Sequence, residues 1–133
     1  MVRAGHVNNW DLVDVSAPII GDYLISDPRH MEVLEKLSRS KSLWQRRIAI
    51  IFTFAFLRKG ITGPTVVIAE NLLDDDQDLI HKAVGWMLRE AGKRDGRLLR
   101  EFLNENASQM PRTMLRYSIE KFAESERKKW LRY

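Results

Sequence analysis

The segment K-A-V-G-W-M at residues 82–87 resembles R-I-A-I-I-F at residues 47–52, and the two segments begin 35 residues apart. A weaker copy, R-Y-S-I-E-K, begins at Arg116, 34 residues after Lys82, and chance remains an alternative explanation for this third copy. A short helix, a turn and a longer helix, repeated at this period, are typical of an α-solenoid. We therefore predict an all-α fold, an α-solenoid of antiparallel helix pairs that forms a HEAT-like or ARM-type superhelix. The shorter helices that precede the three copies are expected over residues 29–38, 64–73 and 96–107.

Helical periodicity runs through nearly the whole chain, and no stretch alternates as a β-strand does. Capping and breaking residues divide the chain into helices of moderate length. Two of the remaining helices are predicted near the N-terminus, a short one capped by Asn9 and one over residues 16–25. Three more are predicted from Ser42 to Gly60, from the acidic residues 74–76 to about Lys93, and from Pro111. A final turn is expected with Ser125 as its cap.

The length of 133 residues is that of one domain, and we expect residues 1–133 to form a single HEAT-like-repeat domain. Cysteine is absent, which excludes disulfides and thiolate metal sites. The N-terminal residues lack the apolar region of a signal peptide, and the longest apolar stretch, residues 48–57, is too short to span a bilayer. These features favour a cytoplasmic protein that does not associate with membranes.

The sequence offers little for metal or cofactor chemistry. Its three histidines, His6, His30 and His81, lack the spacing of metal ligands, and the acids of residues 74–78 lack the spacing of an EF-hand. We expect neither a metal nor a cofactor. The formal net charge of +4 is a mild indication of a polyanionic partner, so the placement of the charges matters more than their sum.

The predicted helix after residue 76 separates into an apolar side and a basic stripe. Lys82, Trp86, Arg89 and Lys93 recur at i, i+4, i+7 and i+11, opposite the apolar residues. Gly85 borders this stripe and is expected to leave room for a close approach. Core packing is the usual place for a tryptophan, but an indole among three cations is typical of a nucleic-acid contact surface. The apolar residues are Ile80, Ala83, Val84, Met87, Leu88 and Ala91.

The preceding repeat places Arg47, Ile51, Phe54 and Arg58 at equivalent positions, on a helix that should be central and buried. Stacking of the repeats would bring Arg47 beside Lys82; the alternative is that Arg47 pairs with an acid of a neighbouring helix. Arg46, about a quarter-turn away, is expected to be solvated. With Lys82, Arg89 and Lys93, these three arginines (46, 47 and 58) form the predicted DNA-binding set.

The stretch N-N-W-D-L-V-D at residues 8–14 places Trp10 and Asp14 at i and i+4, so they share one face of a helix. The structural alternatives are that Trp10 packs against Ile19 or Leu24 and that Asp14 pairs with an arginine. Asp11 is rotated away from this face and can support the first-turn amide groups.

The motifs W-D-x-V-D, W-x-R-R-x-A and K-A-x-G-W-x-L-R-E follow one another in this chain, and over about residues 6–123 it resembles the DNA alkylation repair enzymes, which are HEAT-like-repeat DNA glycosylases. The resemblance implies a monofunctional enzyme that removes cationic N3- and N7-alkylated purines from double-stranded DNA. It also implies that Trp10, Asp14 and Trp86 form the catalytic cleft and that Arg47 grips backbone phosphate. The alternative is a catalytically inactive solenoid that binds DNA or protein.

The family resemblance also implies a single-carboxylate mechanism. A cationic alkylated purine leaves as a neutral base, so no general acid is required, and Asp14 would stabilise the charge that develops on the deoxyribose. Members of the family carry further helices before the W-D-x-V-D motif, so we expect this chain to correspond to their C-terminal half. The exposed N-terminal end is then expected to allow self-association.

Overall fold

The computed structural model describes residues 30–132, and within this range the chain is helical without strands. The all-α prediction is therefore confirmed for the described part of the chain, whereas the helices expected after Asn9 and over residues 16–25 lie outside it. The seven helices are α2 (His30–Ser38), α3 (Leu43–Arg58), α4 (Gly63–Asn71), α5 (Asp78–Arg94), α6 (Gly96–Asn106), α7 (Arg112–Ser118) and α8 (Glu124–Trp130).

Local capping interactions define several of these helix ends. The Ser42 side chain accepts a hydrogen bond from the Gln45 amide at the start of α3, as predicted, and Asp95 accepts one from the Leu98 amide at the start of α6. Gly60 follows the end of α3 with a φ of 79°, a conformation that glycine adopts without steric cost. The predicted cap at Ser125 is wrong, because α8 begins at Glu124 with Ala123 as its N-cap.

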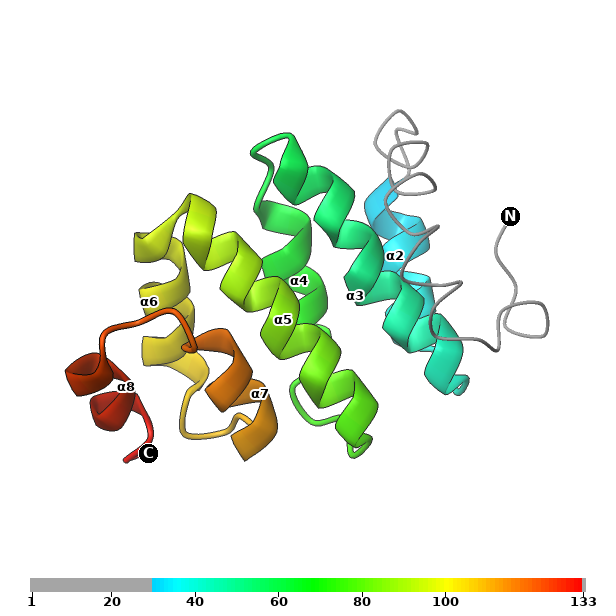
Figure 1. The fold of residues 1–133 in the computed structure, drawn as a ribbon. Coiled ribbons are helices and arrows are strands. Elements are labelled where there is room, and N and C mark those ends of the chain that lie inside the picture. The colour runs from blue at the N-terminus through cyan, green and yellow to red at the C-terminus, as the bar shows by residue number, and fades with distance from the viewer. Residues whose placement is uncertain (1–29, 133) are drawn as a thin grey trace.

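The helices form two layers (Figure 1). The front layer contains α3, α5 and α7, which lie side by side, with α5 in contact with both of the others. Behind it lie α2, α4 and α6: α2 packs against α3, α4 against α3 and α5, and α6 against α5. In Figure 1, α3 and α5 run in the same direction.

The core lies between these layers, and α5 contributes the whole apolar side predicted for it: Ile80, Ala83, Val84, Met87, Leu88 and Ala91 are each no more than 1% exposed. Helix α3 is buried almost all round, from Arg47 to Thr53 and from Ala55 to Leu57, which confirms its predicted central position. Removal of these apolar side chains from water is the main source of stability for such a fold.

The third repeat departs from the predicted pattern. Helix α7 has 7 residues and is shorter than the 11-residue α6 that precedes it, so a short helix followed by a longer one is wrong for this repeat. Only the first half of R-Y-S-I-E-K is helical, because α7 ends at Ser118. Ile119 is the C-cap of this helix, and its amide donates the last hydrogen bond, to the carbonyl of Leu115.

The C-terminal helix α8 is attached to α6 by a carboxylate. Glu126 accepts two hydrogen bonds from Arg100, at 2.8 and 2.9 Å, and a third from the indole of Trp130 at 3.2 Å. The bond from the Arg100 guanidinium holds the pKa of Glu126 below its ordinary value. Trp130 is 4% exposed, so the basic C-terminal residues belong to a docked helix.

Gly85 determines how closely α5 and α7 approach each other. It is buried, and a Cβ added to it would lie 2.5 Å from the Cβ of Tyr117 and 2.7 Å from the carbonyl oxygen of Met114. The expectation that Gly85 leaves room for a close approach is therefore confirmed, and the segment that approaches is helix α7.

We expect Gly85→Ala to lower the free energy of unfolding by about 2 kcal/mol, because backbone atoms of α7 must move to admit the methyl group. Gly63→Ala is the matched control: an added Cβ there meets no atom within 4 Å, so its effect should stay within about 0.5 kcal/mol. Urea unfolding followed by circular dichroism measures both. Equal stabilities of the two variants would contradict the assigned α5–α7 packing.

Candidate nucleic-acid interface

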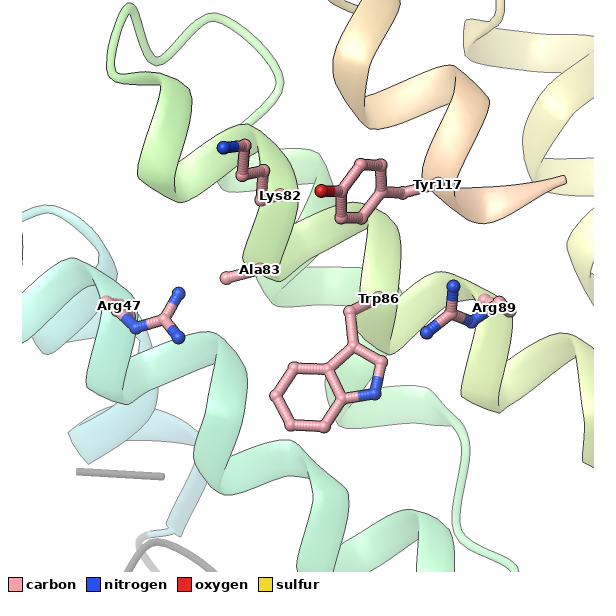
Figure 2. Close-up of a pocket in the computed structure, with 6 residues that line it drawn as sticks. All are labelled: Arg47, Lys82, Ala83, Trp86, Arg89 and Tyr117. Carbon is pink, nitrogen blue, oxygen red and sulfur yellow. The ribbon is translucent and has the colours of Figure 1, made fainter. Parts of the chain in front are cut away.

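A pocket of about 260 Å³ opens where α3, α5 and α7 meet (Figure 2). The front layer of helices supplies all of its walls: Arg47 comes from α3, the floor comes from α5, and α7 contributes one residue. Three cations, two aromatic rings and a methyl group therefore surround a single opening. The lining residues are Arg47, Lys82, Ala83, Trp86, Arg89 and Tyr117.

Trp86 joins the core to the pocket. Its ring is partly buried against the core and lies 6.2 Å from the ring of Phe54, centroid to centroid, at an interplanar angle of 39°. The same residue lines the pocket, between Arg47 and Arg89 in the view of Figure 2. Core packing is thus partly confirmed for Trp86, because the indole packs on α3, and the contact surface for nucleic acid stays a prediction for the part of the residue that borders the opening.

The cations of the pocket are held in place by neighbouring groups. Arg47 is only 9% exposed, and its guanidinium donates to the carbonyl oxygen of Leu79 at 3.4 Å. Lys82 lies 3.3 Å from Asp78, one turn earlier on α5. Arg89 forms an ion pair with Glu120, in the turn that follows α7. Arg47 and Lys82 line the same pocket, as the stacking of repeats predicts.

The electrostatic character of the pocket is nevertheless cationic. The acids Asp78 and Glu120 pair with Lys82 and Arg89 from outside, and among the described residues that line the pocket there is no carboxylate. Both acids are more than half exposed. The pair of Lys82 and Asp78 is exposed on both sides and contributes little, about 0–1 kcal/mol, whereas the Arg89 side chain is only 19% exposed. A phosphate that enters the pocket would therefore meet three cations, of which Lys82 has the weakest competing partner.

The other predicted contact residues lie outside the pocket lining. Lys93 is exposed and forms an ion pair with Glu90 at 3.1 Å, and Arg58 is exposed at the end of α3. The expectation that Arg46 is solvated is wrong: its side chain is 16% exposed, and its Nε lies 2.6 Å from Asp75. It also donates to the carbonyl oxygen of Ser40 at 3.0 Å, so it ties the start of α3 to the turn before α5.

Tyr117 lines the pocket although the sequence analysis did not select it. It is 37% exposed and projects from α7 over α5 (Figure 2). The one indication of Tyr117 in the sequence is its place in the weak third repeat, where it directly follows Arg116, the residue that aligns with Lys82. Contact between α5 and α7 through Gly85 was needed to place this ring beside the predicted stripe.

Trp10 and Asp14 lie outside the described residues, so their predicted place in a catalytic cleft stays a prediction. Within residues 30–132, no group of three or more histidine, cysteine or acidic side chains is arranged to hold a metal ion. In the same range, no helix is both long enough and apolar enough to cross a membrane.

Comparison with known protein families gives one finding: the model of a family described as DNA alkylation repair enzyme matches residues 1–122. A search among curated proteins finds no match for this chain.

We expect Arg46→Ala to lower the free energy of unfolding by about 2 kcal/mol, because it removes a charged hydrogen bond and leaves the 7%-exposed Asp75 carboxylate without its guanidinium. Arg58→Ala removes an exposed arginine from the same helix and should change stability by less than about 0.5 kcal/mol. Chemical denaturation compares the two variants. If Arg46→Ala left the free energy of unfolding unchanged, the ion pair with Asp75 would not stabilise the fold.

Proposed function

Because the chain belongs to the DNA alkylation repair enzyme family, we propose that it is a DNA glycosylase that hydrolyses the N-glycosidic bond of cationic N3- and N7-alkylated purines in duplex DNA. The observation that carries this proposal is the pocket in which Arg47, Lys82 and Arg89 surround the half-buried ring of Trp86. Cations that meet phosphate and an aromatic face that meets a sugar or base are the two requirements of such an interface.

The layered arrangement of the helices supports a more specific fold within this proposal. We infer that the two layers are the two helices of successive HEAT-like repeats, so that the repeats place α3, α5 and α7 on one face. Duplex DNA would lie across this face, with a backbone phosphate in the pocket at the junction of the three helices. Arg47 is the deepest of the cations, because it is only 9% exposed.

Trp86 takes part in lesion recognition in this proposal. The face of an indole attracts a cation, and such a contact contributes roughly 0.5–2 kcal/mol. An alkylated purine carries the positive charge that an ordinary base lacks, so the same contact discriminates between them. The packing of Trp86 on Phe54 fixes the plane of the ring in advance of binding, which lowers the entropic cost of recognition.

Trp10 and Asp14 complete the proposed chemistry. The carboxylate of Asp14 stabilises the positive charge that develops on the deoxyribose and orients the attacking water, while Trp10 forms a second aromatic wall. The leaving base is already cationic and departs as a neutral molecule, so one carboxylate suffices where most glycosidases use two. The electron pair of the C–N bond leaves with the base, which becomes neutral. Water adds to the sugar carbon as a hydroxyl group, and its other proton passes to solvent.

The release of alkylated base from methylated duplex DNA tests this function. The wild-type chain should release 7-methylguanine or 3-methyladenine, and Asp14→Asn should lower the rate by about 100-fold or more, since it removes the only proposed charge that stabilises the transition state. Asp11→Asn is the matched control, three residues earlier in the same motif, and should retain most of the activity. Chromatography of the released bases gives the rates. If the wild-type chain bound duplex DNA but released no alkylated base, the proposed glycosylase activity would be contradicted and only DNA binding would remain.

We expect Glu120→Gln to increase affinity for duplex DNA about threefold at low salt, because it frees Arg89 from its ion pair and removes a negative charge beside the pocket. Glu101→Gln is the matched control: Glu101 is 59% exposed and also pairs with an arginine, Arg97, but it lies on α6 outside the pocket. Fluorescence anisotropy with a labelled duplex measures both. Equal gains from the two variants would indicate an effect of net charge alone.

A further inference from the structure

Tyr117 is held in a fixed position at the edge of the cationic pocket. Its Cβ lies against Gly85 so closely that no side chain fits between α7 and α5 at this point. Its neighbours Ser118 and Ile119 are each 1% exposed, so the backbone that carries Tyr117 is anchored on both the α5 side and the C-terminal side. The ring is therefore positioned by the core, although 37% of the residue is exposed.

The hydroxyl of Tyr117 is available to a ligand. Its ring projects over α5, with the hydroxyl on the side of the pocket where Lys82 lies (Figure 2). Among residues 30–132 no hydrogen bond from this hydroxyl to protein is formed, while the neighbouring Lys82 and Arg89 each pair with an acid. A phenolic O–H is a neutral donor that needs no counterion, and it complements the charged groups beside it.

The surrounding charges determine which chemical group this hydroxyl would meet. Arg47, Lys82 and Arg89 line the same pocket, and within residues 30–132 no acidic residue lines it. An anionic oxygen is favoured there, and in duplex DNA that oxygen belongs to a phosphodiester. The exocyclic groups of a base are neutral and gain little from three cations.

We propose that Tyr117 is a DNA-positioning residue, whose hydroxyl donates a hydrogen bond to a backbone phosphate in the pocket while its ring closes the α7 side against the sugar. This inference rests on the proposed function only in that duplex DNA is the ligand. Gly85 serves the same end, because it lets α7 approach α5 far enough for the ring to reach the pocket. The contact fixes the register of the duplex and carries no sequence information.

The test measures affinity of the full chain for an unmodified duplex at several salt concentrations. Tyr117→Phe keeps the ring and should weaken binding roughly tenfold or more at every concentration, since it removes one hydrogen bond to a charged group. The slope of log affinity against log salt should not change, because a neutral donor displaces no counterion. Arg89→Gln should instead reduce that slope by about 0.9.

Two further variants separate positioning from a structural role. Thr113→Val removes a hydroxyl one turn earlier on α7, outside the pocket lining, and should leave affinity and salt slope unchanged. Tyr117→Ala retains the Cβ that contacts α5 and should bind more weakly than Tyr117→Phe because it loses the ring as well. Thermal unfolding of Tyr117→Phe should match that of the wild-type chain.

The proposal is overturned if Tyr117→Phe binds duplex as tightly as the wild-type chain, or if Thr113→Val weakens binding equally. A wild-type chain that binds duplex but releases no alkylated base would overturn the proposed enzymatic function alone, and the Tyr117→Phe comparison would still decide this inference. A wild-type chain with no affinity for duplex at low salt would overturn both.

Discussion

The missing side chain at Gly85 is the constraint on which the candidate site depends. Only hydrogen at this position lets the backbone of Met114 and the Cβ of Tyr117 rest on α5. This contact completes a front layer in which α3, α5 and α7 lie side by side, and the pocket opens at their junction. A close helix–helix contact inside the core thus determines the width of a polar opening at the surface.

The charges of the site are balanced in a way that suits reversible binding. Arg47 is buried and fixed, whereas Lys82 and Arg89 lie at the edge with exposed acidic partners. Exposed ion pairs cost little to break, so these two cations keep an ordered position and can exchange a carboxylate for a phosphate. In the proposed complex with DNA, such exchange would lower the net gain on binding and favour release from undamaged sites.

Much of this arrangement could be predicted from the sequence, because it depends on local periodicity. The apolar side of α5 and the central burial of α3 follow from spacing alone, as does the placement of Lys82, Trp86 and Arg89 on one stripe. What could not be predicted depends on contacts between distant segments. The pairing of Arg46 with Asp75 spans 29 residues, and the approach of Tyr117 requires the α5–α7 packing. No periodicity within one helix contains that information.

The most direct test of the account is to locate duplex DNA on the protein by nuclear magnetic resonance. A short duplex is titrated into the isotope-labelled chain while the indole N–H of Trp86 and the Nε–H groups of Arg47 and Arg89 are followed. The account predicts that these resonances shift together and saturate at one duplex concentration, because they belong to one pocket. Saturable shifts at the basic residues of α8, with Trp86 and both arginines unperturbed, would contradict it.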